Sequence, residues 1–534
     1  MSDVVVVGGG PAAHRLAARL VRYGHRGTVT VAGAEEVPPY NRALLGSVLD
    51  GTLPAERLRL PALPAAVTLL TGTRVTGVDR ARRTVRTEDG RELAWDVLVL
   101  ATGARPRVPY VPGLVTARGR PAEGVRTVRT AADCRALPPG PVTVLGGGVL
   151  GVESALALRR AGHEVALVHP APLLMERHLD EEASAVLAGL LAVRGVAVHL
   201  GRRAAEYVQG KLVLDDGQVV AAGTVLLCAG TEPDTELARA CGLTIRHGVV
   251  VDDRLRTSDP RIHAIGDCAE HAGAVGSTVT SAWEQAEALA RVLTGSPRPY
   301  RPRPRVLRPR TGDIETVVLL PAREDGTADG TIGVSTGDTT GGATAGTAAG
   351  TASRTTDRTA DETADETVSL TDRAGGRYAR LALREGRIHR GVVIGPAAAV
   401  AAAGHLHETG AVLPEDRLAL LTGSEGTYAG DGELPDDAVV CHCNNVTRGA
   451  LRRAWTGGAR DTAALARATR ATTGCGSCAA VVRGLCTSLA SSAPQPRTQH
   501  STTGTATRTS PATATSPSTS ASATATATAQ GENR

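Results

Sequence analysis

Four cysteines close to the C-terminal end have the residue type and spacing of a metal-binding group. Cys441 and Cys443 form a C-x-C pair, and after an interval of 31 residues Cys475 and Cys478 form a C-x-x-C pair. Thiolates are soft ligands, and four of them on two short loops can surround a [2Fe–2S] cluster or a tetrahedral Zn²⁺. Zinc sites usually open with two to four residues between the first two cysteines, so the one-residue gap favours the [2Fe–2S] cluster. A zinc site and four unligated cysteines of a hydrophobic core are the alternatives.

A glycine-rich turn stands at the N-terminal end of the chain. The apolar run at 4–7 predicts a buried parallel strand, and a helical pattern follows at 14–23. Between them, Gly8, Gly10 and Ala13 form a G-x-G-x-x-A motif. In such a motif the first glycine makes the turn, the second lets a pyrophosphate approach the backbone, and the small third residue lets helix and strand pack closely. The motif therefore predicts a site for a dinucleotide.

An acidic residue follows where a dinucleotide site needs one. A second strand is expected at 28–32, and Glu35 comes shortly after it, 22 residues past Ala13. A carboxylate at this place accepts hydrogen bonds from the adenosine ribose. A glycine motif alone could be an ordinary tight turn, but the strand, the helix and the acid together favour the dinucleotide site.

The same pattern recurs further along the chain. A strand is expected at 142–145, then Gly146, Gly148 and Gly151 form a second glycine motif, and a helix is expected at 152–161. Two such motifs in one chain indicate two dinucleotides.

The end of the next strand, expected at 164–168, bears on the choice of nicotinamide nucleotide. His169 stands where an NAD-binding site often carries an acid, and Arg177 is the first arginine after it. No arginine therefore follows directly to bind a 2′-phosphate, which favours NADH over NADPH.

The composition limits the class of protein. A chain of 534 residues is too long for one core, so three or four domains are expected. The net charge is +5, and the basic residues are spread through the chain, which argues against a nucleic-acid binder. No apolar run reaches the length of a membrane span, and the N-terminus lacks a signal peptide. The remaining cysteines occur singly, so we expect a cytoplasmic protein without nucleic-acid or membrane partners.

The order of these motifs resembles that of flavoproteins that bind two dinucleotides. The segment 96–106 resembles their strand returning to the FAD domain, and 262–267 resembles their strand-Gly-Asp motif. The resemblance implies an FAD domain in two segments with an NAD(P)H domain inserted between them. It implies that Asp267 binds the ribityl chain, although an aspartate in that position could also simply cap a helix. Further FAD contacts implied by the resemblance are Ala101, Thr102, Gly103 and Gly266.

The disulfide reductases of this class are excluded, because they need a C-x₄-C pair beside the flavin and no cysteine lies between Gly8 and Gly72. The segments 39–45, 174–180 and 283–285 instead resemble two relatives from nitrogen assimilation. These are the N-terminal half of assimilatory NAD(P)H-nitrite reductase large subunits and the electron-transfer subunit of assimilatory nitrate reductase.

That resemblance implies roles for three residues. Arg42 is expected near the flavin, Glu153 near the nicotinamide as a second catalytic residue, and Trp283 beside the cofactor. A surface arginine and an exposed helical glutamate are the structural alternatives for Arg42 and Glu153. The four-cysteine region resembles the [2Fe–2S] domain of bacterioferritin-associated ferredoxin.

The expected fold class is α/β, with two Rossmann-like domains, a small α+β domain that often lines a subunit interface, and a small helical cluster domain. Low-complexity composition predicts a disordered insertion and a disordered tail. The expected boundaries are 1–115 and 240–300 for FAD, 116–239 for NAD(P)H, 301–425 for the interface domain with its insertion at 323–376, 436–487 for the cluster and 488–534 for the tail.

The implied function is that of an NAD(P)H-dependent oxidoreductase that uses FAD and a [2Fe–2S] cluster. Because the chain has no residues for a sirohaem domain, the expected acceptor is a separate protein. The nitrate reductase catalytic subunit and a sirohaem nitrite reductase are the two acceptors considered, and a homodimer is possible. A ferredoxin-type or general acceptor reductase outside nitrogen metabolism, and a non-catalytic redox-sensing or iron-handling module, are the alternatives.

Overall fold

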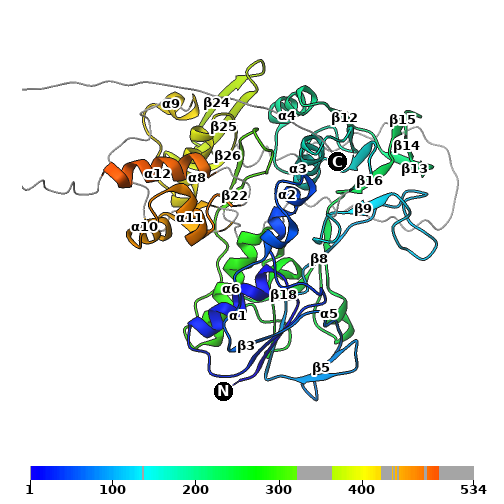
Figure 1. The fold of residues 1–534 in the computed structure, drawn as a ribbon, viewed down its shortest axis with the longest axis vertical. Helices are drawn as coiled ribbons and strands as arrows, with labels where there is room; N and C mark the ends of the chain where they lie inside the picture. Colours follow the sequence, from blue (N-terminus) through cyan, green and yellow to red (C-terminus); the bar gives the residue numbers. More distant parts are fainter. Residues whose placement is uncertain are drawn as a thin grey trace, which may run out of the picture.

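The structure is a computed structural model that describes residues 2–134, 137–321, 364–422, 436, 439–441, 444, 446–473 and 478–491. Figure 1 shows an N-terminal domain in blue and green, a second domain in cyan and teal, a sheet in yellow and a group of orange helices. In the part of the chain that the structure describes, no helix has both the length and the apolar character needed to span a bilayer.

The N-terminal domain is built on a five-stranded parallel sheet. Its strands follow the order β19-β7-β1-β2-β3. From β1 the chain adds β2 and β3 on one side, and it then adds β7 and β19 on the other side. Every residue of β1 is buried, as expected for a run of valines in a sheet covered on both faces. The crevice between β1 and β7, where the strand order reverses, is where such sheets bind ligands. The strands are β1 (Val4–Val7), β2 (Val29–Ala32), β3 (Val67–Leu70), β7 (Val97–Leu100) and β19 (Ile262–Ala264).

Two helices far apart in sequence pack together against this sheet. Helix α1 (Pro11–Arg22) follows the first glycine motif and buries its apolar stripe, and α6 (Val279–Leu293) comes from the second segment of the domain. The two segments therefore form one core, as the two-segment domain requires. Two small sheets complete the domain: an antiparallel one of β4 (Val75–Asp79), β5 (Thr84–Thr87) and β6 (Glu92–Ala94), and a mixed one of β18 (Val249–Val251), β20 (Ala269–His271) and β21 (Ala274–Val275), in which β18 and β20 are parallel.

The second domain repeats the parallel architecture with the order β12-β11-β10-β16-β9. All four residues of β10 are buried, and helix α3 begins directly after the second glycine motif. The short strands β8 (Ala104–Pro106) and β17 (Thr231–Pro233) pair where the chain enters and leaves this domain. Its elements are β9 (Val125–Thr127), β10 (Val142–Leu145), α3 (Val149–Arg160), β11 (Val165–His169), α4 (Glu181–Val193), β12 (Val196–Leu200), β13 (Ala204–Val208), β14 (Lys211–Leu214), β15 (Val219–Ala221) and β16 (Thr224–Leu227).

The third domain is an antiparallel sheet in the order β22-β23-β26-β25-β24, with helices α8 and α9 packed beside it. Ion pairs join it to the second domain, for example Arg373 with Glu182 and Arg194 with Asp313. Its elements are β22 (Arg305–Leu307), β23 (Thr316–Leu320), β24 (Glu366–Asp372), β25 (Arg377–Arg384), β26 (Arg387–Ile394), α8 (Ala397–Thr409) and α9 (Arg417–Thr422).

The expected insertion at 323–376 is wrong in its last part. Residues 364–376 belong to the sheet, because β24 pairs along its whole length with β25. The partly buried Val368 and Leu370 alternate with polar residues, which is the pattern of a half-buried edge strand. Residues 322–363 lie outside the described part of the chain.

The described residues of the C-terminal domain form a ribbon of two strands and a group of helices: β27 (Val439–Cys441), β28 (Val446–Thr447), α10 (Arg448–Thr456), α11 (Thr462–Thr469) and α12 (Ala479–Ser491). The side chain of Thr447 accepts a hydrogen bond from the amide of Ala450 and caps α10. The expected start of the tail at 488 is too early, because α12 continues to Ser491.

Candidate functional site

One long cleft of about 3460 Å³ joins the first and second domains. Both glycine motifs line this cleft, and so do parts of the third domain. Of the residues expected to bind cofactors, the cleft is lined by Gly8, Gly10, Glu35, Arg42, Ala101, Thr102, Gly103, Gly146, Gly148, Glu153, Gly266, Asp267 and Trp283. The tertiary structure therefore brings residues that are up to 275 positions apart in the sequence to one surface.

The first glycine motif is shaped as a phosphate-binding turn. Gly8 follows β1 with φ +122°, and a Cβ atom there would lie 2.1 Å from the carbonyl oxygen of Ala101. Gly10 precedes α1 with φ −85°, and the nearest atom to its Cβ position is an arginine side-chain nitrogen 4.0 Å away. Ala13 is fully buried inside the domain. Gly8 is thus required by the fold itself, whereas the space at Gly10 is left open beside the helix N-terminus, as a pyrophosphate would need.

The second motif repeats this geometry. Gly146 has φ +123°, and its Cβ would lie 2.3 Å from the carbonyl oxygen of Cys228. A Cβ at Gly151 would lie 1.8 Å from the carbonyl oxygen of Gly146, so helix and loop pack too closely for a side chain. No atom comes within 4 Å of the Cβ position at Gly148, at the start of α3. The residues present therefore fit two dinucleotides, one at each loop.

Glu35 and Arg42, which the sequence suggests contact different parts of a bound dinucleotide, form an ion pair in the cleft. The hydroxyl of Tyr40 donates to the second carboxylate oxygen of Glu35 at 2.7 Å, and Arg42 donates to the carbonyl oxygen of Arg129 at 2.8 Å. Burial of Tyr40 raises the pKa of its phenol, so it stays a hydrogen-bond donor. The roles of Glu35 at the ribose and of Arg42 at the flavin stay predictions.

Asp267 also has a partner that the sequence motifs did not indicate. Arg129 donates to its carboxylate at 2.9 Å. The amide of the preceding Gly266 donates to the side-chain oxygen of Gln285 at 2.7 Å, which ties the strand-Gly-Asp turn to α6. Trp283 lies on the same helix, is 9% exposed and faces the cleft. Arg129 has no local motif of its own, because its position follows only from the docking of the two domains.

The backbone that follows β7 is fixed by contacts with the segment around Asp234. The hydroxyl of Thr102 donates to the carbonyl oxygen of Asp234 at 2.7 Å, and Gly103 has φ +77°. Ala101 is buried directly below the first glycine motif. These contacts fix the wall of the cleft on which the resemblance places FAD.

Glu153 lies on α3 behind the second motif, and one carboxylate oxygen accepts a hydrogen bond of 2.6 Å from the amide of Arg310. Burial raises the pKa of this carboxyl group, although the charge and the amide of Arg310 oppose the shift. The raised pKa favours the protonated carboxyl group, which suits a group that takes part in proton transfer. Arg310 belongs to the third domain, which accordingly contributes to the cleft.

His169 at the end of β11 is paired with an acid from further along the chain. Its Nε2 atom lies 3.0 Å from a carboxylate oxygen of Glu176, and both residues line the cleft. Burial would raise the pKa of Glu176, but the hydrogen bond and charge of His169 outweigh it and lower the pKa. Glu176, seven residues after His169, thus brings a carboxylate to the end of β11. A sequence search for acids confined to the strand end does not find it.

The described part of the cysteine-rich region holds two of the four expected ligands. Cys441 ends β27 and is fully buried, and Cys478 stands directly before α12 and is 5% exposed. Asn444 joins the two loops, because its side-chain amide donates to the carbonyl oxygen of Arg470 at 2.8 Å and to the hydroxyl of Thr473 at 3.3 Å.

Cys443 and Cys475 lie outside the described residues, so the complete ligand set stays a prediction. Thiols that are buried at a strand end and at a helix N-terminus fit an anionic iron–sulfur cluster.

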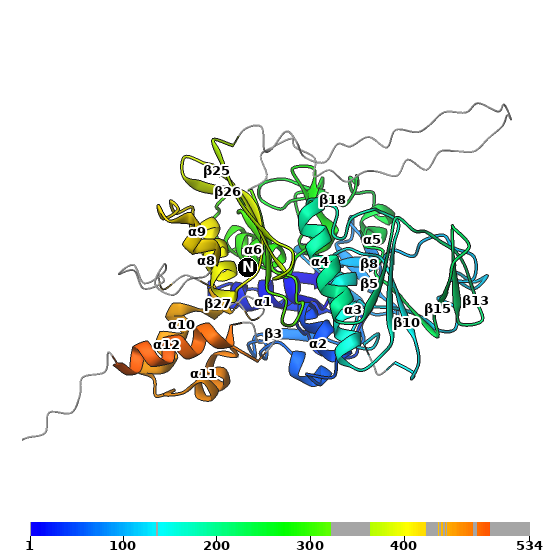
Figure 2. The same cartoon turned by 90° about the horizontal axis from the view of Figure 1, so that it is seen from above.

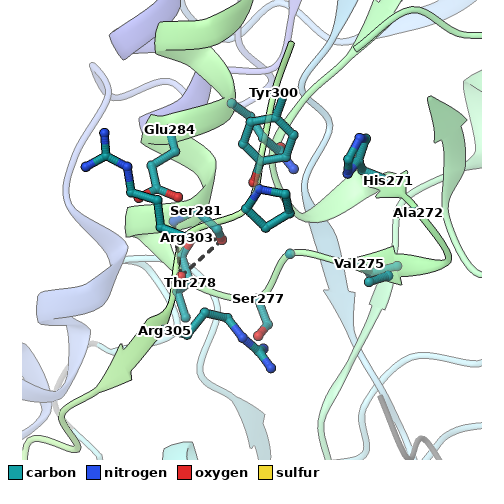
Figure 3. A pocket seen from close by; sticks show the side chains of 14 residues that line it. His271, Ala272, Val275, Ser277, Thr278, Ser281, Glu284, Tyr300, Arg303 and Arg305 are labelled. Atoms are coloured by element: carbon teal, nitrogen blue, oxygen red, sulfur yellow. Dashed lines mark hydrogen bonds between the residues drawn. The ribbon is translucent and has the colours of Figure 1, made fainter. Parts of the chain in front are cut away.

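A second cavity of about 50 Å³ lies beside α6 (Figure 3). Glu284 and His271 line it from different elements, and Tyr300 meets the His271 ring edge-on. Its volume suits a few water molecules and is too small for a nucleotide.

Cys134, the first cysteine of the chain, does not suit redox exchange. It is buried, and this burial raises the pKa of its thiol to about 12. The conclusion that this chain is not a disulfide reductase of the C-x₄-C type therefore stands.

Comparison with known proteins identifies two families. Residues 2–288 match the family described as pyridine nucleotide-disulphide oxidoreductase, and residues 439–486 match the BFD-like [2Fe-2S] binding domain. The chain therefore carries an FAD- and NAD(P)H-binding flavoprotein part followed by a [2Fe–2S]-binding domain.

Two curated relatives come from nitrogen metabolism. The chain is 32% identical over 309 residues to the assimilatory nitrate reductase electron transfer subunit of Bacillus subtilis, covering 55% of this chain and 39% of the relative. It is 31% identical over 424 residues to the nitrite reductase [NAD(P)H] large subunit of Klebsiella oxytoca, covering 77% of this chain and 40% of the relative. The chain thus spans about two fifths of the length of each.

The fold also matches a solved structure. The putidaredoxin reductase of its covalent complex with putidaredoxin superimposes with a TM-score of 0.64 and 26% identity, over 79% of this chain and 95% of that one. The strand orders, the two glycine motifs and these matches agree, and the chain belongs to the pyridine nucleotide-disulphide oxidoreductase family.

Proposed function

We propose that this protein takes electrons from NAD(P)H and delivers them to a nitrate or nitrite reductase in the cytoplasm. The observation that carries the proposal is the extent of the match to the nitrite reductase large subunit. That match covers 424 residues, whereas the flavoprotein family accounts for residues 2–288. Because the match spans 77% of this chain, it continues past residue 288.

The cofactors supply the redox chemistry: when bound, FAD accepts a hydride from NAD(P)H and releases electrons singly to the cluster. The chain supplies binding and orientation. In this proposal the two glycine motifs seat the pyrophosphates, Glu35 and Glu176 bind the adenosine riboses, and Asp267 orients the ribityl chain. Glu153 holds a proton beside the nicotinamide, because its burial favours the neutral carboxyl group.

The test is anaerobic stopped-flow mixing with NADH, followed by addition of an acceptor. We expect rapid bleaching of the flavin, then the electron paramagnetic resonance signal of a reduced [2Fe–2S] cluster. NADH-dependent reduction of nitrate or nitrite should occur only when a nitrate reductase catalytic subunit or a sirohaem nitrite reductase is added. Flavin bleaching without later cluster reduction, or four-thiolate zinc in anaerobically isolated protein, would refute the proposal.

A second candidate is a ferredoxin-type reductase outside nitrogen metabolism. The superposition on 95% of putidaredoxin reductase favours it. Turnover with a [2Fe–2S] ferredoxin or a dye, combined with no turnover through either nitrogen-assimilation partner, would select this candidate. Negligible turnover with every acceptor would instead indicate a redox-sensing module.

A further inference from the structure

The cysteine-rich domain is packed against the FAD-binding domain. One continuous cluster of buried apolar side chains includes Leu45 and Leu58 of the N-terminal domain together with Val440, Leu465 and Ala471 of the C-terminal domain. In Figure 2 the orange helices α10 to α12 lie at the side of the blue N-terminal domain. The leucines of the N-terminal domain are therefore covered by the C-terminal domain and are not exposed to solvent, as expected for a docking interface.

Among the described residues, an arginine of the C-terminal domain donates two hydrogen bonds to the FAD-binding domain. Arg470 ends helix α11 and donates to the carbonyl oxygen of Arg59 at 2.6 Å and to that of Arg57 at 3.1 Å. These carbonyls lie at the end of the short 3-10 helix η2 (Ala55–Leu58), where carbonyl groups point outward and attract a cation. The side chains of Arg57 and Arg59 are exposed, and Arg470 contacts the backbone of these two residues.

The same residue holds the cysteine loops. The carbonyl oxygen of Arg470 accepts the hydrogen bond from Asn444, which follows the C-x-C pair by one residue. Arg470 also lies five residues before Cys475. A displacement of Arg470 therefore moves the loops that are expected to carry the cluster.

The segment that Arg470 contacts is in turn hydrogen-bonded to residues that line the cleft. Arg59 pairs with Tyr40 in an antiparallel bridge, and the amide of Leu60 donates to the carbonyl oxygen of Pro39 at 2.9 Å. Pro39 and Tyr40 both line the cleft. Burial lowers the pKa of His14 on α1, and the charge of Arg470 contributes to that shift, which places the guanidinium group close to the helix of the first glycine motif.

We propose that Arg470 is the positioning residue that docks the [2Fe–2S] domain onto the FAD domain at Arg57 and Arg59, in the arrangement that allows electrons to pass within the chain. The inference rests on the proposed function, because it assigns a residue to the step between the two cofactors. Electron transfer needs the two groups to be held close, and the hydrogen bonds of Arg470 to the two carbonyl groups hold the two domains together.

The test uses the full-length protein with Arg470→Ala, Arg470→Gly and the matched control Arg467→Ala. Arg470 has φ +67°, so glycine relieves the backbone while it removes the guanidinium group. Arg467 is an exposed arginine on the same helix and carries the same charge. A slower cluster reduction in both Arg470 variants but not in Arg467→Ala is therefore due to weaker docking and not to misfolding or to the change in net charge.

Two measurements are compared. Amide hydrogen exchange of residues 57–60 and 446–470 should increase in both Arg470 variants. Flavin bleaching by NADH should stay within about two-fold of the wild type, while later cluster reduction slows by about ten-fold or more. Unchanged exchange, or increased exchange with an unchanged rate of cluster reduction, would overturn the inference. A wild-type protein that fails to reduce its own cluster would refute the proposed function instead, and exchange would still report on the Arg470 contact.

Discussion

The two outer glycines of the first motif separate what the fold requires from what the cofactor requires. We compare Gly8→Ala with Gly10→Ala. Gly8 has φ +122° and only 2.1 Å between its Cβ position and the carbonyl oxygen of Ala101, whereas Gly10 has φ −85° and no atom closer than 4.0 Å. Alanine at Gly8 must therefore strain the backbone and push β1 away from β7, while alanine at Gly10 fits the protein.

The magnitudes follow from these contacts. At Gly8, the backbone conformation costs about 1–3 kcal/mol and the overpacking about 1–3 kcal/mol, so the free energy of unfolding should fall by roughly 2–6 kcal/mol. This is a large part of the 5–15 kcal/mol that a typical domain possesses, and it should lower Tm by roughly 4–24 °C. Gly10→Ala should change stability by less than about 0.5 kcal/mol, since backbone entropy and the loss of a glycine cap nearly cancel.

The assay combines thermal unfolding of the apoprotein with titration by FAD. Gly10→Ala should keep the apoprotein Tm but weaken FAD binding by roughly 100-fold, because its Cβ occupies the space where the pyrophosphate approaches. If Gly10→Ala binds FAD as tightly as the wild type, the first motif does not seat the pyrophosphate. If Gly8→Ala unfolds at the wild-type temperature, the structural account of the turn is wrong.

Three further predictions test other parts of the molecule. Glu176→Gln should raise the ratio of kcat/KM for NADPH over that for NADH, because a carboxylate repels a 2′-phosphate. The expected increase is only about ten-fold, because the Glu176 side chain is partly exposed and solvent screens its charge. An unchanged ratio would contradict this prediction. Cys441→Ser and Cys478→Ser should each lose the bound iron while keeping FAD, and Cys486→Ser should keep both, as checked by metal analysis and absorption spectra. Burial lowers the pKa of His263 to about 4, so below about pH 6.5 the unfolded chain binds a proton that the folded protein does not. The free energy of unfolding should therefore decrease by about 3 kcal/mol between pH 6.5 and 4, and urea unfolding should show a flatter acid limb for His263→Gln.

The sequence predicts best those features that depend on neighbouring residues. The valine run at 4–7 and the strand at 142–145 appear with the expected bounds. Their signals are local, since a glycine after a buried strand acts within one turn of the chain. Strand β24 was predicted as part of an insertion, because its polar residues become a strand only when paired with β25.

The sequence by itself therefore determined that two phosphate-binding turns and a four-cysteine motif occur in one chain, because each is encoded within a few dozen residues. Only the tertiary structure decided which side chains meet across the domains. Arg310 reaches Glu153 across 157 positions, and Arg470 reaches Arg59 across 411. Such pairs have no local signal, because their proximity arises from the burial of apolar faces between domains and not from the order of residues around either partner.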